Sequence, residues 1–470
     1  MRLCSIDLTN FRNYDRLRLD IPDGTHVFHG ANAQGKTNLL EAIYLCTCAR
    51  SHRTGRDEEL VKHGCDFYRV SIQFVTDRGL NESVTLEYKH AQTRGGSPSR
   101  TIYYNDLEVA RLADMMGLFH AIIFAPEDLQ IVKGGPSERR RFLDVLISRT
   151  DRAYFRDLQD FWRVIGQRNR LLKNLKVNGS FNGRVADRNF SDGRTAFDED
   201  ESEPPESEMI FPDPAAQLDI WDEQLASIVS AILKKRLDVT EKLSEYASLS
   251  IRHLTSSQEQ LDIQYRGFGG LDRDMMSRET IERLYLERLR RSRDDDIFRG
   301  STSSGPHRDD LQLSLNGVEA RLFSSQGQQR SIVLSLKIAE LMLLTEMTGE
   351  TPILLLDDVM SELDQSRRSK LMEVIQGHQV FLTCTDTAQI FPSDQILISE
   401  NIDAAVESGG EDNRSTERDD RTPRAGWTSN IFYYEVVKGT VKPEDRYQAE
   451  GLRRRVDSKL KGNAGELIPQ

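Results

Sequence analysis

The chain has 470 residues, 38% of them apolar, and a mean hydropathy of −0.54, which suits a water-soluble protein of two or three domains. It contains no run of about eighteen apolar residues, so we expect no membrane span. Its five cysteines lack a C-x-x-C pair, which argues against a disulfide framework or a zinc site. The charged residues Asp7 and Arg12 interrupt the apolar character of the N-terminal segment too early for a secretory signal, so we expect a cytoplasmic protein.

The net charge of −12 is unevenly distributed along the chain. Residues 198–213 contain eight acids and no base, and residues 400–424 contain eight acids and four arginines. The remainder is therefore neutral overall. Within it, residues 137–176 carry eleven bases and five acids. This stretch is either a surface for a nucleic-acid backbone or a solvated helix face with ordinary excess charge.

The first part of the chain has strand patterns separated by polar turns. Apolar residues alternate or cluster at residues 3–8, 17–19, 26–29, 68–75, 83–88, 100–104 and 121–124. Strands follow one another here without regularly alternating helices. We therefore predict an α+β lobe rather than a series of βαβ units.

A glycine-rich segment follows the third of these strands and precedes a helix-like apolar pattern. It fits the phosphate-binding loop G-x-x-x-x-G-K-[ST] and consists of Gly30, Ala31, Asn32, Ala33, Gln34, Gly35, Lys36 and Thr37. In such a loop the backbone N–H groups cradle the phosphates of ATP, Lys36 neutralises their charge, and Thr37 offers its hydroxyl to Mg²⁺. The plainer alternative is a glycine-rich turn that ends a strand.

Two long helical patterns occupy the middle of the chain. Apolar residues recur at helical spacing in residues 158–172 and again in residues 218–233, which predicts an antiparallel helical arm. Residues 178–214 between them are rich in Asn, Gly, Ser, Pro and acids, so we expect a disordered acidic loop. Helical spacing returns at residues 278–291.

After residue 301 the α/β pattern returns. A buried strand at residues 352–356 ends in the acid pair Asp357 and Asp358. With a phosphate loop in the same chain, Asp357 is the natural Mg²⁺ partner of Thr37, and Asp358 is placed to orient or deprotonate the attacking water. Without the phosphate loop, such a pair would more often be a simple solubilising turn at a strand end.

A third segment lies directly before a helix at residues 331–347. It resembles the L-S-G-G-Q signature of the ABC ATPase superfamily, with Ser325, Gly327 and Gln328 on the matching positions and Gln326 in place of the first glycine. A hydroxyl and backbone N–H groups at a helix N-terminus suit a γ-phosphate, although a polar capping turn would look similar. In the superfamily this segment completes the site of the opposite subunit, which implies an ATP-dependent homodimer.

Smaller segments fit the same resemblance. Residues 361–364 match the D-loop, and Glu127 falls near the expected Q-loop. Thr385 occupies the place of the switch histidine, which predicts weak or strongly regulated hydrolysis.

Several strings, in order, resemble the RecF family of bacterial DNA replication and repair proteins over residues 1–400. They fall at residues 8–14, 35–43, 51–53, 126–129, 134–144 and 305–311. The resemblance implies an α/β fold: an ABC-type ATPase head, made of an α+β lobe and a phosphate-loop core, with an inserted antiparallel helical arm. The expected domains are residues 1–135 and 301–399 for the head, 136–300 for the arm, and 400–470 for a polar, partly disordered tail with one possible edge strand at residues 431–437.

The resemblance also implies the activity and the partners. We expect a weak, DNA-dependent ATPase that acts as a switch, dimerises on ATP, and binds double-stranded, gapped or junction DNA. RecR and RecO are the expected protein partners, and the role is in recombinational gap repair, recombinase loading and the SOS response.

For DNA contact we expect phosphate contacts from arm arginines, namely Arg139, Arg140, Arg141, Arg149, Arg152 and Arg156. Ion pairing is an equal alternative for the first three. His307 and Arg308 either sense nucleotide or fix a turn. Two other functions remain to be separated from the RecF-type one: an ABC transporter ATPase subunit, and a small-molecule kinase in which Ser325–Gln328 would have no phosphate role.

Overall fold

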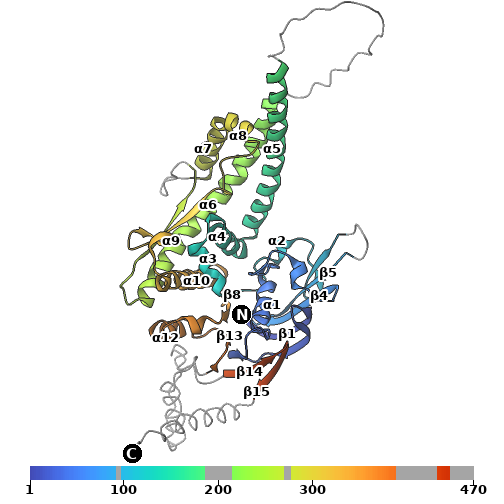
Figure 1. Cartoon of the computed structure of the whole chain (residues 1–470), viewed down its shortest axis with the longest axis vertical. Coiled ribbons are helices and arrows are strands. Elements are labelled where there is room, and N and C mark those ends of the chain that lie inside the picture. The colour runs from blue at the N-terminus through green and yellow to red at the C-terminus, as the bar shows by residue number, and fades with distance from the viewer. Residues whose placement is uncertain (92–96, 186–213, 269–276, 388–430, 445–470) are drawn as a thin grey trace, which may run out of the picture. The chain divides into compact units, whose positions relative to one another are not determined.

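The computed structural model describes residues 1–91, 97–185, 214–268, 277–387 and 431–444 (Figure 1). The chain divides into two compact units. Unit 1 comprises Met1–Gly134, Leu243–Asp262 and Ser314–Gln470, and unit 2 comprises Gly135–Lys242 and Ile263–Leu313. Within the described ranges, none of the helices is both long enough and apolar enough for a bilayer span.

One sheet of unit 1 is antiparallel, with the strand order β2-β1-β4-β5-β6-β7. Its strands are β1 (Arg2–Phe11), β2 (Tyr14–Asp20), β4 (Phe67–Val75), β5 (Asn81–Lys89), β6 (Ser99–Tyr104) and β7 (Leu107–Glu108). In β4, Tyr68, Val70, Ile72 and Phe74 are buried, and the residues between them are exposed or half-buried. This period of two is what a sheet with one face on the core requires, and it agrees with the predicted α+β lobe.

The second sheet of unit 1 has the order β15-β14-β3-β13-β12-β8 and is parallel except for β15. Its strands are β3 (Thr25–His29), β8 (Ala121–Phe124), β12 (Ile353–Asp357), β13 (Val380–Cys384), β14 (Ile431–Val437) and β15 (Thr440–Glu444). Every residue of β8, β12 and β13 is buried, as expected for strands covered on both faces.

The position of β14 corrects the expectation of an edge strand. β14 pairs in parallel with β3 on one side and antiparallel with β15 on the other, so it lies inside the sheet. The strand pattern at residues 431–437 was visible in the sequence. Its neighbours were not, because β3 lies about 400 residues earlier in the chain, as in the pair of Tyr434 with His26.

Helix α1 (Lys36–Cys48) packs against β4 of the antiparallel sheet and against β8 and β12 of the parallel one. It is buried on nearly all sides for this reason, and its N-terminus is held at the carboxyl end of β3. The other helical elements of unit 1 are η1 (Asp57–Leu60), α2 (Leu112–Met115), η2 (Pro126–Leu129), α3 (Gln130–Lys133), α9 (Ala320–Phe323), α10 (Gln326–Thr348), α11 (Val359–Glu362) and α12 (Gln365–Val374).

Unit 2 is mainly helical. Its helices are α4 (Pro136–Thr150), α5 (Arg152–Val185), α6 (Pro214–Leu254, which enters unit 1 after Lys242), α7 (Arg278–Arg291) and α8 (Arg293–Arg299). A small sheet, ordered β11-β10-β9, contains β9 (Leu261–Arg266), β10 (Asp310–Leu315) and β11 (Val318–Glu319), and the chain passes between the units within β9 and β10.

Polar pairs between α5 and α6 establish their relative direction. Tyr154, early in α5, contacts Arg236, late in the unit 2 part of α6, while Arg168 further along α5 contacts the earlier Asp222. The order of partners is reversed, so the two helices run antiparallel, as predicted (Figure 1).

Helix α5 continues to Val185, so residues 178–185 are helical although they were assigned to the disordered acidic loop. Once a helix is nucleated, each added residue gains a hydrogen bond at low cost, so a polar composition does not end it. At the other end of that predicted loop, Pro214 is the first residue of α6. Residues 186–213 lie outside the described residues, as does most of the polar tail.

Candidate nucleotide-binding site

Residues 30–37 form the turn between β3 and α1, and two of its glycines are required by geometry. Gly30 has φ of 146° and Gly35 has φ of 120°, a region that side-chain-bearing residues rarely adopt. A Cβ atom on Gly30 would lie 2.5 Å from the Val436 carbonyl oxygen, and one on Gly35 would lie 2.7 Å from Asn13 Nδ2. The segment is therefore a tightly held loop that leads into the N-terminus of α1. The free backbone N–H groups at that end of the helix favour binding of an anion.

The Lys36 side chain folds back over this loop. Its Nζ donates to the carbonyl oxygens of Gly30 at 2.7 Å and Ala31 at 2.9 Å. Burial lowers the pKa of Lys36, while the nearby Cys384, Asp358 and Asp357 act in the opposite direction. The ammonium is thus held at the loop by two neutral carbonyl oxygens, which a phosphate can replace.

Thr37 and the acid pair come together as predicted. Thr37 Oγ1 donates to Asp357 Oδ1 at 2.9 Å, and Thr383 Oγ1 donates to the same oxygen at 2.7 Å. Burial raises the pKa of Asp357, and the two hydroxyl donors oppose that rise. A hydroxyl and a carboxylate oxygen this close are the hard donors that Mg²⁺ uses, so the residues fit that ion.

Asp358 has an unusual backbone conformation. Its φ of 52° is left-handed, which costs a residue other than glycine about 1 kcal/mol or more. Its N–H donates to Thr383 Oγ1 at 2.9 Å, and its Oδ1 is buried without a hydrogen-bond partner among the described residues. The strain and the unsatisfied carboxylate oxygen mark this residue as adapted to a ligand or water rather than to a solubilising turn.

Thr383 was not assigned a role from the sequence. It bridges both acids: it donates its hydroxyl proton to Asp357 and accepts from the Asp358 N–H. Its position at the carboxyl end of β13, next to β12, follows from the sheet order. The available sequence signal was its place at the end of a buried strand, where ligand-binding residues of parallel sheets gather.

The signature-like residues form the N-terminal turn of α10. Ser325 is the N-cap: its Oγ accepts from the Gln328 N–H at 3.3 Å, and Gln328 Oε1 accepts from the Ser325 N–H at 2.9 Å. Ser325 is exposed, and the space around Gly327 is open to 4 Å. The capping turn that was the alternative to a signature segment is therefore present, and it leaves the start of a 23-residue helix accessible to a ligand.

The other predicted segments flank the acid pair. Ser361 donates to the carbonyl oxygen of Asp358 at 2.8 Å, and Asp364 caps α12. Thr385 is exposed just beyond β13. Glu127 lies 3.6 Å from Arg53.

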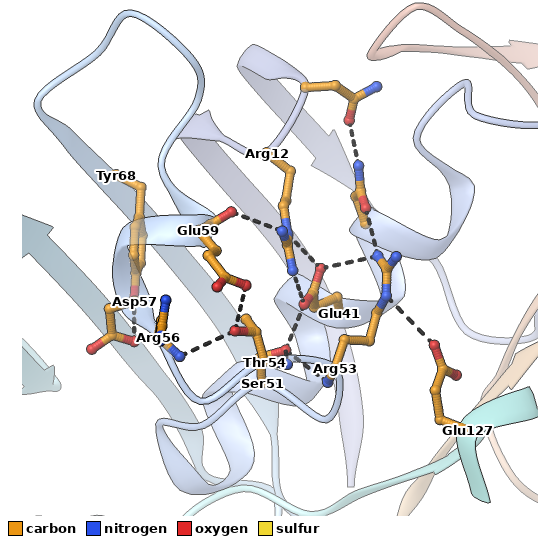
Figure 2. A network of polar contacts seen from close by, with 12 residues as sticks. Arg12, Glu41, Ser51, Arg53, Thr54, Arg56, Asp57, Glu59, Tyr68 and Glu127 are labelled. Atoms are coloured by element: carbon orange, nitrogen blue, oxygen red, sulfur yellow. Dashed lines mark hydrogen bonds and ion pairs between the residues drawn. The ribbon is translucent and has the colours of Figure 1, made fainter. Parts of the chain in front are cut away.

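Figure 2 shows that Arg53 belongs to a polar network around the buried Glu41 of α1. Arg12 makes two hydrogen bonds to Glu41, at 2.9 and 2.7 Å, and Arg53 lies 3.6 Å from the same carboxylate. Burial alone would raise the pKa of Glu41, but hydrogen bonds from Arg12 and Ser51, with the charges of Arg12 and Arg53, lower it. Glu41 is therefore held as a carboxylate that fixes Arg53.

Arg53 also donates to Asn38 Oδ1 at 3.2 Å, and its charge acts on Asp357. It is a second cation near the phosphate loop, about one third exposed. In the sequence Arg53 stands out only as part of a string that resembles the RecF family, because its partners lie in two other segments, α1 and η2.

The arm arginines differ from one another in exposure. Arg139 is buried and pairs with Asp310 at 2.7 Å, and Arg149 is buried too. Direct DNA contact by these two is not supported, and ion pairing, the alternative weighed for Arg139, is what the structure contains. Arg140 donates to the Asp309 carbonyl oxygen at 2.7 Å and, like Arg141, is half-buried. Only Arg152 and Arg156 of the predicted set are exposed.

His307 packs within unit 2. Its ring contacts those of Phe161 and Trp162, with centroids 5.7 and 6.3 Å away, and its Nε2 lies 3.3 Å from the Thr302 carbonyl oxygen. Burial lowers the pKa of His307 to about 4. These contacts favour the turn-fixing role.

Comparison with known proteins identifies the family. The family model described as the RecF/RecN/SMC N terminal domain matches residues 2–401. The DNA replication and repair protein RecF of Ruminiclostridium cellulolyticum is 40% identical over 382 residues, covering 81% of this chain and 91% of that protein. Its counterpart in Heliobacterium modesticaldum is 38% identical over 387 residues, covering 82% and 92%. The chain belongs to the RecF family.

RecF structures share the fold as well. The solved structures of RecF-ATP and RecF-ATPrS from the RecFOR pathway are 31% and 30% identical to this chain, and both have a TM-score of 0.72. Each alignment covers 94% of this chain and 98% of the other. The predicted ATPase-head fold and the RecF-type role in DNA replication and repair are thus confirmed, and the transporter alternative is not favoured.

Proposed function

We propose that this RecF-family chain binds ATP with Mg²⁺ and uses slow, DNA-stimulated hydrolysis as the switch of a DNA-bound homodimer. The observation that carries the proposal is the 2.9 Å hydrogen bond between Thr37 Oγ1 and Asp357 Oδ1. It joins two motifs 320 residues apart, and a nucleotide–metal site is the function that needs both together. Solved structures of the relative RecF with ATP and with ATPrS support the same ligand class.

Each residue of the site has a separate task. The loop N–H groups of residues 30–37 bind the phosphates, and Lys36 exchanges its two carbonyl partners for phosphate oxygens. Thr37 and Asp357 hold the metal, which when bound neutralises phosphate charge and orients the terminal phosphate. Thr383 keeps Asp357 aimed at the loop.

Asp358 is the group that orients or deprotonates the attacking water, because its Oδ1 has no other partner among the described residues. No imidazole stands at the position of Thr385. A hydroxyl is a poor proton carrier near neutral pH, so we expect a slow chemical step and a long-lived ATP state.

The accessible start of α10 supplies the intermolecular contact. Ser325, Gly327 and Gln328 would bind the γ-phosphate of a second copy through the Ser325 hydroxyl and the helix N-terminus. Two nucleotides then join two chains, and hydrolysis removes the γ-phosphate that both chains contact.

DNA is the ligand of the ATP-bound dimer in this proposal. The exposed Arg152 and Arg156, together with the half-buried Arg140 and Arg141, remain as phosphate contacts. Arg139 and Arg149 are left out because they are buried. The RecFOR pathway of the structural relatives supports RecR and RecO as partners in recombinase loading, gap repair and the SOS response.

Light scattering with and without ATP and Mg²⁺ tests the dimer. We expect the parent to dimerise with nucleotide and Ser325→Arg to remain monomeric. Ser277→Arg is the matched control, because Ser277 is also an exposed N-cap serine, of α7 in unit 2, and loses a similar capping energy of about 1 kcal/mol. A parent that stays monomeric, or a Ser325→Arg variant that dimerises like the control, contradicts the proposal.

Binding to gapped and to blunt duplex DNA, in the presence of MgATP, tests the DNA-binding part of the proposal. Gapped duplex should bind more tightly, and Lys36→Met should abolish the ATP dependence. If the two DNA forms bind equally whatever the nucleotide, the switch mechanism is wrong.

A further inference from the structure

The hairpin of β14 and β15, defined by residues 431–444, touches the phosphate loop directly. β14 pairs in parallel with β3, the strand that leads into the loop, with Tyr434 opposite Phe28 and Glu435 opposite His29. Lys438 and Gly439, which lie between the end of β14 and the start of β15, form the hairpin turn. The family model ends at residue 401, before this hairpin.

Gln34, in the middle of the loop, is the residue that the hairpin holds. The Lys438 N–H donates to Gln34 Oε1 at 2.7 Å, and the Gly439 N–H donates to the Gln34 carbonyl oxygen at 2.9 Å. Asn13 Nδ2 donates to that same carbonyl oxygen at 2.8 Å. Three donors thus fix the side chain and the backbone of one loop residue.

The hairpin and the loop are also closely packed against each other. The Val436 carbonyl oxygen fills the space where a Cβ atom on Gly30 would lie. Gly439, with φ of 74°, has the Asn13 carbonyl oxygen 2.5 Å from the position of its own missing Cβ. Glu444 lies 3.2 Å from His29 Nε2 at the end of β3. Neither side can shift without moving the other.

A phosphate loop binds through backbone N–H groups, so its affinity depends on those groups already pointing inward. We propose that the β14–β15 hairpin is a positioning element of the nucleotide site: through the Lys438 and Gly439 amides on Gln34, it holds residues 30–37 in the form that receives the triphosphate. This inference rests on the proposed ATP binding. Gln34 and Gly439 are positioning residues, and neither takes part in the chemical step.

Linkage makes the coupling reciprocal. If the hairpin raises nucleotide affinity, bound nucleotide must stabilise the hairpin against opening by the same factor. Amide exchange in residues 431–444 should therefore slow when nucleotide binds.

The test compares two glycine substitutions that share backbone strain and differ in contact. Gly439→Ala places a methyl group against the Asn13 carbonyl oxygen, whereas Gly79→Ala, at φ of 81° in the β4–β5 turn, has nothing within 4 Å. We expect Gly439→Ala to weaken MgADP binding about tenfold, equivalent to about 1.4 kcal/mol. Gly79→Ala should bind as the parent does, and kcat at saturating ATP should change less than affinity in both.

Two further measurements separate positioning from general damage. The nucleotide-free Gly439→Ala variant should melt at a lower temperature than Gly79→Ala, because only its methyl group meets the Asn13 carbonyl oxygen. The rise in melting temperature on adding MgADP should nevertheless be smaller for Gly439→Ala, which a loss of stability without a loss of nucleotide affinity would not produce. Gln34→Leu, which removes the acceptor for the Lys438 N–H without adding a charge to the phosphate loop, should also weaken nucleotide binding.

The outcomes distinguish this inference from the function on which it rests. If the parent does not bind MgADP or MgATP, the proposed function itself is wrong. If the parent binds nucleotide but Gly439→Ala binds equally well and exchange in residues 431–444 is unaffected by nucleotide, the hairpin has no positioning role.

Discussion

The phosphate loop of unit 1 and the arginine-rich helices of unit 2 use charge in opposite ways. In unit 1, Lys36 is held by two neutral carbonyl oxygens, and Asp358 keeps an oxygen without a partner among the described residues. In unit 2, Arg168 lies fully buried between Asp222 and Asp296, and Arg236 makes three hydrogen bonds to Asp144. Charge in the first region is available for a ligand, whereas much of the charge in the second is used to hold helices together.

This contrast teaches that a net charge counted along the sequence does not locate a binding surface. The excess of bases in residues 137–176 includes Arg139 and Arg168, which the structure pairs with acids from outside that stretch. A short motif is a better guide, because its spacing already specifies the geometry that its chemistry needs.

The largest expected effect lies in unit 1. Asp358→Asn should lower kcat for ATP hydrolysis by about 10²- to 10⁴-fold, the usual contribution of a proton acceptor, and leave nucleotide affinity nearly unchanged. Asn tolerates the left-handed backbone at φ of 52°, so the local fold should persist. Single-turnover hydrolysis and nucleotide titration together check this. Equal hydrolysis by parent and variant would remove Asp358 from the mechanism.

The second effect belongs to unit 2. Arg168→Met should lower the free energy of unfolding by about 3–5 kcal/mol, because it removes the cation paired with the buried Asp296 and one of the two cations paired with the buried Asp222. Arg163→Met, on the same helix but 71% exposed beside Asp160, should cost no more than about 1 kcal/mol. Chemical denaturation of both variants decides between a structural and a surface role for Arg168. Similar losses of unfolding free energy in the two variants would show that burial of the Arg168 ion pairs is unimportant for stability.

A pH effect sharpens the contrast further. Burial raises the pKa of Asp309 to about 6, so the folded state holds a proton between about pH 4 and 6 that the unfolded state releases. This carboxyl group therefore makes the protein less stable as pH rises through that window, by about 2–3 kcal/mol in total.

The change Asp309→Asn isolates that effect from His307, whose lowered pKa acts with the opposite sign. The unfolding free energy of the parent minus that of the variant should fall between pH 4 and pH 6, as followed by denaturant titration at each pH. A flat difference would mean that Asp309 has an ordinary pKa.

The smallest effect concerns DNA. Arg156→Gln should weaken binding a few-fold and reduce the slope of log affinity against log salt by about one, as for loss of one phosphate contact. Arg139→Gln should lower stability and leave that slope unchanged, because its partner is Asp310. Salt titrations of both variants test the assignment, and a reduced slope for Arg139→Gln instead of Arg156→Gln would reverse it.

Much of the site could be predicted because its parts are local in sequence. Gly30, Lys36, Thr37, Asp357 and the N-cap Ser325 each lie in a short segment whose residue types and spacing satisfy one chemical demand. The strands and the paired helices of unit 2 could also be predicted, since periods of 2 and 3.6 record which face is buried. These features needed no knowledge of distant contacts.

Tertiary structure alone decided the rest, because it depends on residues far apart in the chain. Thr383 reaches both acids only when β13 lies beside β12, and Arg53 is fixed by partners from two other segments, α1 and η2. Gln34 meets Lys438 across 404 residues. Local periodicity carries no information about which distant strand will be a neighbour or which acid will neutralise an arginine, so those choices become visible only once the chain has packed.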